Sequence, residues 1–430
     1  MKEGMRKYFG VTFLIGLGFF TMGLMDPLYD TYIPIFLSRY LGSKGLIGTV
    51  MTLDNIFAIF LIPFVSALSD RTSTRIGRRM PFIIVTLPLS ALFFSLIPFS
   101  ALWSLPALIT IIFFLNVFKQ AARGPVVALM PDIIPGEYRS EANGVINTMG
   151  GVAAIVGTIA LARLMDIEIT LPRFGRTDGI LPFPVAGVLV ILSTLILFLF
   201  VKEKHRAEGE EKTGITESLK MVFSGKDKSA LLVLISLFLW FLGYQGVLPF
   251  IGLYSVEVIG VSSGTAGLAA GMVAIAYALF AIPSGFIAHR YGRARTIRVS
   301  LVMLSVITLA LASHSSLSGL LGFSRTAMMI SFFALLFVFG IFWVSVITNS
   351  FPMLWQLATY GNIGIYTGLY YTFSQTAAIG APPITGFIID LMGFPGIFIF
   401  ASVCMLSAWF ILGKVSGNET ETAAVAGTDP

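Results

Sequence analysis

The stretch that decides the fold runs from Pro63 to Pro81 and reads PFVSALSDRTSTRIGRRMP. An apolar run ends at Asp70, four arginines follow between positions 71 and 79, and Pro81 opens the next apolar run. An arginine at the centre of a bilayer costs about 2.5–3.5 kcal/mol on insertion scales, so this turn must lie outside the hydrocarbon. The stretch therefore predicts a tight hairpin between two membrane-spanning helices, on the side with excess positive charge.

A second, similar stretch lies half a chain later. It runs from Gly285 to Arg293, reads GFIAHRYGR, and is again flanked by apolar runs. Pro283 precedes it much as Pro63 precedes the first copy. Two copies at equivalent places predict a chain built of two related halves.

Both copies resemble the signature loops of the major facilitator superfamily. The first contains D-R-x-x-x-R-x-G-R-R, and the second fits G-x-x-x-[DN]-R-x-G-R with His289 in place of the acid. The matching residues are Asp70, Arg71, Arg75, Gly77, Arg78 and Arg79 in the first copy, and Gly285, His289, Arg290, Gly292 and Arg293 in the second. The resemblance implies that Asp70 locks the cytoplasmic end of the protein in its outward-open state.

The composition agrees with a membrane protein. Hydrophobic residues make up 56% and charged residues 12% of the 430, against about 45–50% and 25% in soluble domains. The single cysteine, Cys404, lies in an apolar run and excludes a disulfide framework. The net charge of +6 does not indicate nucleic-acid binding, because the basic residues fall in loops that flank apolar runs. The N-terminal run is expected to be an uncleaved first span.

Apolar runs long enough to cross a bilayer, about 18 residues or more, predict membrane spans. Twelve are expected, at 9–37, 46–68, 81–100, 106–129, 141–163, 181–201, 229–254, 264–288, 296–313, 326–350, 364–389 and 394–413. The polar stretch 202–228 is expected to be a cytoplasmic linker between an N-terminal bundle, 1–201, and a C-terminal bundle, 229–414. A polar tail follows at 415–430.

The distribution of Lys and Arg sets the orientation. Most of the 28 fall on the side of both termini, which the positive-inside rule assigns to the cytoplasm. We therefore expect a multi-pass protein of the plasma (inner) membrane. We also expect it to act as a monomer. The resemblance implies an all-α fold of twelve helices in two pseudo-symmetric six-helix bundles, each made of inverted three-span repeats around a midplane cavity.

Further motifs resemble the sugar branches of the superfamily, especially the disaccharide–proton symporters. They are GPVVALMPD from Gly124, RSEAN from Arg139, RIGRRMPF from Arg75, SFPMLW from Ser350 and YTGLYYTFSQ from Tyr366. Two positions depart from the pattern. The arginine expected after Gly-Pro falls on Val127, and Arg123 lies one turn earlier. Ala58 and Ile62 stand where sodium–glycoside symporters carry acids, so that sodium site is absent.

Ionisable side chains within spans are rare and usually functional. Asp26 and Asp30 lie one turn apart in the first span with Pro27 between them, and Asp54 lies in the second. Burial and neighbouring like charge favour the protonated carboxyl, so these are the candidate proton-coupling residues. The alternatives are that Asp30 lies at the wetted outer interface and that Asp54 is a helix-start acid.

The fourth span carries the candidate charge partners, Lys119 and Arg123, at i and i+4. Asp26, Asp54 and Asp132 are their expected carboxylate partners. One hypothesis is a switch in which protonation of the acid frees the cation; the alternative is a fixed bridge between helices. Nearby amides are candidate substrate-binding residues: Asn55, Asn116 and Gln120.

The second half has no matching charge within its spans, but it has aromatic and amide side chains suited to neutral sugars. These candidates are Trp240, Tyr244, Gln245, Trp343, Asn349, Tyr370, Tyr371 and Gln375. Most of the aromatic residues of the chain are expected in the core or the interfacial belt, so the two glutamines are the stronger candidates.

The function expected from these motifs is proton-coupled symport of a disaccharide or related glycoside. Three alternatives stay open: a sodium-coupled sugar symporter, a proton-driven efflux antiporter of amphipathic compounds, and a receptor or scaffold without transport. No enzymatic activity, metal or cofactor is expected beyond the coupling ion, because the three histidines lack metal-ligand spacing and no phosphate-binding loop occurs.

Overall fold

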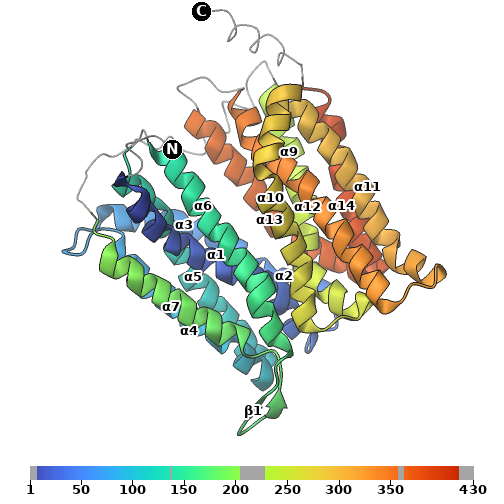
Figure 1. Cartoon of the computed structure of the whole chain (residues 1–430), viewed down its shortest axis with the longest axis horizontal. Coiled ribbons are helices and arrows are strands. Elements are labelled where there is room, and N and C mark those ends of the chain that lie inside the picture. Colours follow the sequence, from blue (N-terminus) through green and yellow to red (C-terminus); the bar gives the residue numbers. More distant parts are fainter. Residues whose placement is uncertain (1–6, 136–137, 204–227, 357–362, 416–430) are drawn as a thin grey trace, which may run out of the picture. The chain divides into compact units, whose positions relative to one another are not determined.

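The computed structural model describes residues 7–135, 138–203, 228–356 and 363–415, most of them helical (Figure 1). The helices of the first half are α1 Phe9–Ser38, α2 Lys44–Met51, α3 Leu53–Arg71, α4 Met80–Trp103, α5 Leu105–Ile133, α6 Arg139–Ile155 and α7 Pro182–Phe200. Those of the second half are α9 Ser229–Tyr254, α10 Ser263–Tyr291, α11 Arg293–Leu320, α12 Arg325–Trp355, α13 Ile363–Met392 and α14 Pro395–Leu412. Nearly all of the expected linker and tail lies outside the described residues.

The expected all-helical membrane fold is confirmed. Within the described ranges, eleven helical segments are long and apolar enough to cross a membrane. They correspond to the expected spans apart from 364–389, where α13 nevertheless forms a helix of 30 residues. One element was not expected: β1, Ile169–Leu171, pairs antiparallel with β2, Gly175–Thr177, in the loop before α7.

Local sequence explains where several helices begin. The side chains of Ser43, Ser104 and Ser324 accept hydrogen bonds from backbone N–H groups in the first turns of α2, α5 and α12. These contacts satisfy donors that a helix start leaves without partners. Two spans end irregularly: a π-helical turn, Val156–Leu161 (η3), and a 3-10 turn, Ala162–Asp166 (η4), extend α6, and a π-helical turn, Ser255–Ile259 (η5), extends α9.

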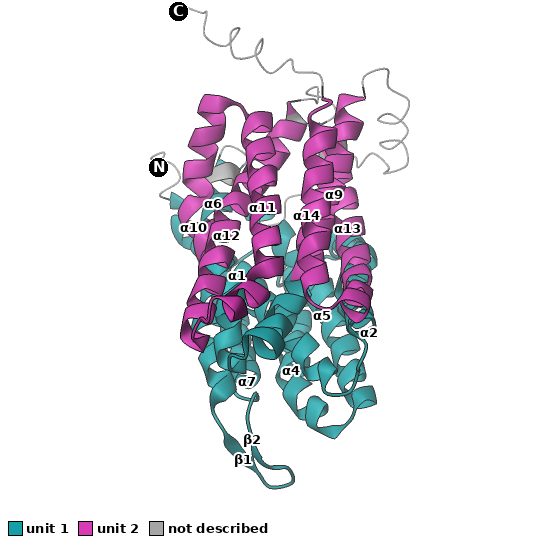
Figure 2. Cartoon of the chain, turned by 90° about the vertical axis from the view of Figure 1, so that its right-hand side faces the viewer, with its two compact units in different colours: residues 1–209, 248–274 teal, residues 210–247, 275–430 magenta. Residues whose placement is uncertain are grey.

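The chain forms two compact units, shown in Figure 2: residues 1–209 with 248–274, and residues 210–247 with 275–430. In unit 1, α1 packs against α6 and α7, α4 packs against α5 and α7, and α3 packs against α5. A buried aromatic cluster joins α1, α4 and α7, where the ring of Phe183 lies 5.0 Å from Phe94 and 5.5 Å from Phe36.

Unit 2 is held by contacts of α11 with α12 and α14, and of α13 with α12 and α14. The hydroxyls of Ser305 and Ser402 lie 2.7 Å apart between α11 and α14. Small polar side chains such as these let helices approach closely, and within the membrane they satisfy each other's hydrogen-bonding groups.

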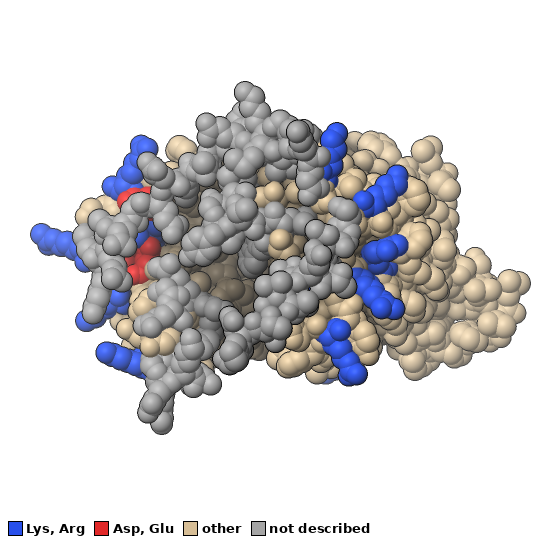
Figure 3. All heavy atoms as spheres, turned by 90° about the horizontal axis from the view of Figure 1, so that it is seen from above, with Lys and Arg blue, Asp and Glu red and all other residues tan. Residues whose placement is uncertain are grey.

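Large apolar side chains are exposed along the spans, including Phe60, Phe64, Phe200 and Phe286. Such exposure is expected of helices whose outer surface meets hydrocarbon. The end of the molecule seen in Figure 3 shows many Lys and Arg side chains and few acidic ones among the described residues.

The close approach of α3 and α5 depends on Gly124. A Cβ at this position would collide with Ser66 Oγ and lie 3.0 Å from the Ile62 carbonyl oxygen. We expect Gly124→Leu to destabilise the protein by about 1–3 kcal/mol through overpacking, measured as a lower thermal unfolding midpoint in detergent. The matched control is Gly319→Leu, at a helical glycine where a Cβ would meet nothing within 4 Å. Equal midpoints for the two variants would contradict this account of the packing.

Candidate functional site

A cluster of charged side chains lies within the spans of unit 1. Lys119 on α5 is buried, and its ammonium lies 2.9 Å from Asp26 Oδ1 on α1 and 3.6 Å from Asp54 Oδ2 on α3. One cation therefore ties three helices together through two carboxylates. Asp26 and Asp54 were predicted as its partners from the sequence, and the structure places both beside it.

The other two charged members of this cluster are bound less tightly. The guanidinium of Arg123 lies 3.8 Å from Asp26 Oδ2, and 43% of the Arg123 side chain is exposed. Asp30 lies one turn beyond Asp26 on α1 and makes no ion pair or hydrogen bond among the described residues. The cluster thus holds three carboxyl groups and two cations, and its pairs use only two of the acids.

Polar side chains surround Lys119. Its ammonium lies 4.6 Å from the centre of the Tyr29 ring, and the Asn116 amide donates to the Tyr29 hydroxyl at 3.0 Å. The buried acceptors Asn116 Oδ1 and Gln120 Oε1 make no hydrogen bond within the described residues. Two buried oxygens without donors are expected to attract a hydroxyl-bearing ligand or water. Asn55 lies beside Asp54 in the first turn of α3.

Proline does not interrupt the first span. Pro27 lies between Asp26 and Asp30, yet α1 continues as one helix from Phe9 to Ser38 with Pro27 and Pro34 inside it. Pro27 lacks a backbone N–H, which removes one hydrogen bond without breaking the helix. Asp26 and Asp30 are therefore held on one face by regular helix geometry.

Unit 2 contains a group of stacked aromatic rings on α9, α12 and α13. Tyr244 stacks on Trp343 with ring centres 4.0 Å apart, and Phe351 stacks on Tyr370 at 3.6 Å. Phe241 meets both Trp343 and Tyr370 edge-on. Tyr244, Trp343 and Tyr370 were predicted as sugar-binding residues. In the structure Tyr244 contacts Trp343 directly, and Phe241 links Trp343 to Tyr370.

The remaining candidates of unit 2 differ in their surroundings. The buried atoms Trp240 Nε1 and Gln375 Oε1 have no hydrogen-bond partner in the described parts of the chain. The Asn349 amide donates to the Ser345 carbonyl, one turn earlier in its own helix, so part of its hydrogen-bonding capacity is satisfied. Gln245 is half-buried, and Tyr371 is exposed.

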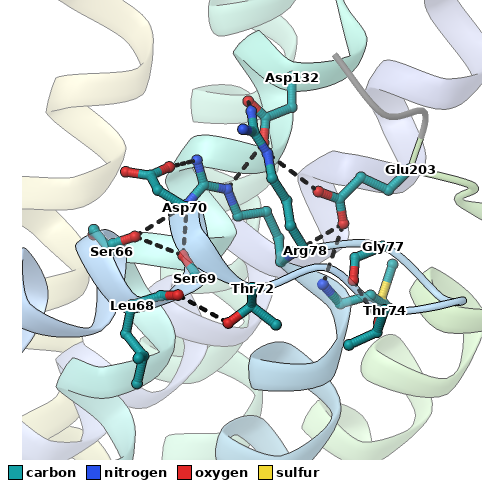
Figure 4. A network of polar contacts seen from close by, with 12 residues as sticks. Ser66, Leu68, Ser69, Asp70, Thr72, Thr74, Gly77, Arg78, Asp132 and Glu203 are labelled. Carbon is teal, nitrogen blue, oxygen red and sulfur yellow. Dashed lines mark hydrogen bonds and ion pairs between the residues drawn. The ribbon is translucent and has the colours of Figure 1, made fainter. Parts of the chain in front are cut away.

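The first signature loop forms a network of ion pairs between the ends of four helices (Figure 4). Arg79 is buried, pairs with Asp70, and donates to Asp132 Oδ2 at 2.9 Å. Arg78 binds the same carboxylate in a fork, at 2.5 and 3.1 Å. The hydrogen bond with Asp132 raises the pKa of Arg78 above its ordinary value. Arg71 and Arg75 are exposed.

Asp132 was expected to serve Lys119 and Arg123, and the structure places it elsewhere. It lies in the last turn of α5, two turns beyond Arg123, and its carboxylate is taken by Arg78 and Arg79. The helical separation explains the difference, since nine residues carry the side chain about 13 Å along the axis.

Glu203 belongs to this network but was not singled out from the sequence. Its side chain is 2% exposed, and it accepts from the backbone N–H groups of Arg79 and Met80 at the start of α4. A carboxylate at a helix N-terminus is favoured by the helix dipole. Gly77 makes room for the Glu203 carboxylate, because a Cβ at this position would collide with it. The backbone of Gly77 also has φ +114°, a conformation that favours glycine. A signal existed in the sequence: an acid directly after an apolar span.

The second signature copy lacks a comparable network among the described residues. Gly292 adopts φ +90° and precedes α11, and Arg293 donates to the Pro352 carbonyl at 3.3 Å. His289 and Arg290 are exposed, and Gly285 lies in the helix with nothing within 4 Å of its Cβ position. In the described residues, no group of three His, Cys, Asp or Glu side chains is placed to hold a metal ion.

A sequence model of the Major Facilitator Superfamily matches residues 9–375, with a second match over 233–428. A hexuronate transporter of Bacillus subtilis (strain 168) is 25% identical over 344 residues, which cover 69% of this chain and 73% of that protein.

Solved structures show the same fold at low sequence identity. The nucleoside transporter NupG, solved as a point mutant, superposes with a TM-score of 0.71 at 12% identity, covering 94% of this chain and 100% of its own. A bacterial homologue of the human lysosomal transporter Spinster, inward-facing and unoccupied, gives 0.70 at 14% identity, covering 97% and 96%.

The shared carboxylate of the loop network predicts a stability effect. We expect Asp132→Asn to cost about 1.5–3 kcal/mol, the range for hydrogen bonds to charged groups, because two arginines lose their common anion. The measurement is the thermal midpoint in detergent. Glu168→Gln is the control, since its ion pair with Arg176 is exposed and should contribute little. The account fails if the two variants unfold at the same temperature.

Removal of Lys119 should leave the half-buried carboxylates of Asp26 and Asp54 without their shared cation, with only the weaker contact of Asp26 to Arg123 remaining. We expect Lys119→Gln to destabilise the protein by about 3–5 kcal/mol, and Lys119→Gln/Asp26→Asn to be more stable than this single variant because one unpaired charge is gone. A double-mutant cycle in thermal unfolding measures the coupling. Strictly additive effects would mean that the two side chains do not interact.

Proposed function

Because the chain belongs to the major facilitator superfamily of membrane transporters, we propose that it carries a sugar or related glycoside by alternating access, coupled to proton entry. The charged cluster on α1, α3 and α5 supports this proposal most directly. Ionisable groups within spans are costly and mark ion pathways. Here Asp30, which has no cation partner among the described residues, lies in the same cluster as Asp26 and Asp54, which share Lys119.

The substrate proposal rests on unit 2. Stacked aromatic rings at Tyr244, Trp343 and Tyr370 suit the C–H face of a sugar ring. The buried polar atoms of Trp240 and Gln375 lack partners among the described residues, and they suit sugar hydroxyls, which both accept and donate. A cavity meant for amphipathic drugs would instead be lined by apolar groups, so these features favour a sugar over an efflux substrate.

A sugar acid is the second candidate substrate. The Arg123 guanidinium is half-exposed and touches Asp26 only at 3.8 Å, so much of its donor capacity is available to a ligand carboxylate. The similarity to a hexuronate transporter supports the same candidate. A planar guanidinium binds carboxylates in a two-pronged fashion.

We propose a proton as the coupling ion and a cytoplasmic location for both termini. Ala58 and Ile62 leave α3 without the paired acids that a sodium site would need. The basic residues at the ends of the spans near the termini support the orientation.

The test measures external pH in lightly buffered proteoliposomes while sucrose, maltose, other glycosides and hexuronates are added in turn. We expect alkalinisation outside with one glycoside, as proton and sugar enter together. A response to hexuronates alone would favour the sugar acid. Accumulation that needs a sodium gradient and moves no protons, or transport only of amphipathic compounds outward, would contradict the proposal.

A further inference from the structure

Charge balance within the spans of unit 1 leaves one carboxyl group uncompensated. Asp26 and Asp54 share Lys119, and Arg123 adds a weaker contact to Asp26. No cation lies within ion-pair distance of Asp30 among the described residues. A carboxylate without a cation is costly within a membrane span, and one bound proton would bring the cluster to neutrality.

The surroundings of Asp30 offer no other cation. The groups that act on it electrostatically are Asp26, Asp54, Lys119 and Arg123. Of the other elements packed against α1, α4 and α7 carry no charged residue. The charged positions of α6, Arg139 and Glu141, belong to its first turn, beside the start of α1, where the rings of Tyr138 and Tyr8 are 5.7 Å apart.

The charged groups near the other end of α1 are distant from Asp30 or have other partners. Arg39, at the C-cap of α1, lies nine residues beyond Asp30, about 13 Å along the helix axis, and its guanidinium lies 5.1 Å from the centre of the Phe36 ring. Lys44, at the start of α2, pairs with Glu257 at 2.6 Å. Asp166, at the end of η4, accepts from Ser262 Oγ at 2.6 Å and from the Gly264 backbone at 2.9 Å. None of these groups is available to Asp30 in this arrangement.

We propose that Asp30, and not the ion-paired Asp26, carries the coupling proton. This rests on the proposed proton symport and deepens it. The carboxylate of Asp30 takes up one proton and becomes a neutral carboxyl group, while Lys119 stays between Asp26 and Asp54. When Asp30 releases the proton, its new charge competes for Arg123, the less tightly held cation of the cluster. Proton release is thereby linked to movement of a guanidinium that can contact substrate.

Substitution of Asp30 and substitution of Asp26 are therefore expected to have different effects. Asp30→Asn removes no ion pair, so the protein should fold, keep its thermal midpoint and exchange labelled sugar across the membrane without a gradient. It should lose sugar-dependent proton movement and accumulation driven by a pH gradient. Asp26→Asn removes two ion pairs and should lower both the thermal midpoint and exchange. Asp30→Glu should retain proton movement.

The experiment compares these variants with the wild type in proteoliposomes, using a sugar that the wild type carries. Proton movement retained in Asp30→Asn would overturn the assignment while leaving proton symport intact. Proton movement absent from the wild type would overturn both proposals.

A second measurement needs no variant. Dicyclohexylcarbodiimide reacts with protonated carboxyl groups in apolar surroundings, and mass spectrometry locates the adduct. In the wild-type protein the label should fall on Asp30, with sugar or raised pH reducing it. Labelling at Asp26 or Asp54 with Asp30 unmodified would overturn the assignment.

Discussion

A charge within hydrocarbon must be compensated by another charge, and this constraint organises unit 1. The ammonium of Lys119 is buried between carboxylates from two other helices. Replacing such a group by apolar packing is often neutral or stabilising, so stability alone does not explain why it is present. Its position also fixes which acid is left over, since a cation already shared by two carboxylates cannot serve a third equally well.

The same constraint acts differently at the ends of the helices. Four arginines in the signature loop are tolerated because they lie outside the membrane, and two of them converge on the single carboxylate of Asp132. Glu203 adds a third carboxylate to those of Asp70 and Asp132. It reaches the start of α4 only because Gly77 has no side chain. The loop therefore couples the ends of α3, α4 and α5 to the chain that leaves α7.

Much of the fold could be predicted from the sequence, because apolar runs and arginine-rich turns record the membrane directly. The proximity of Asp26, Asp54 and Lys119 could also be predicted, since ionisable groups in spans seek each other. Asp132 was assigned to the wrong cations: nine residues of helix carry it about 13 Å from Arg123 along the axis, where Arg78 and Arg79 bind it. The role of Glu203 was missed because it depends on a contact with Arg79, more than a hundred residues away in the sequence. The short β-hairpin, Ile169–Leu171 with Gly175–Thr177, was also missed.

Aromatic residues were the weakest signal. Their number gave no basis for choosing among them. Tyr244 stacks on Trp343 and Phe351 stacks on Tyr370 in unit 2, but Phe93 also stacks on Phe114 and Phe118 in unit 1, so stacking alone does not identify a binding surface. The buried polar atoms Trp240 Nε1 and Gln375 Oε1, which lack partners among the described residues, lie on α9 and α13, two of the helices that carry the stacked rings of unit 2; such unpaired buried groups are rare.

The most direct test of the central claim is the charge carried with each substrate molecule. With equal pH on both sides of the membrane, the reversal potential of the sugar-dependent current through the reconstituted wild-type protein gives this charge. One proton with one neutral sugar predicts a shift of about 59 mV for each tenfold change in the sugar gradient. An electroneutral exchange, or half that shift, would contradict a cluster that needs a single proton for neutrality.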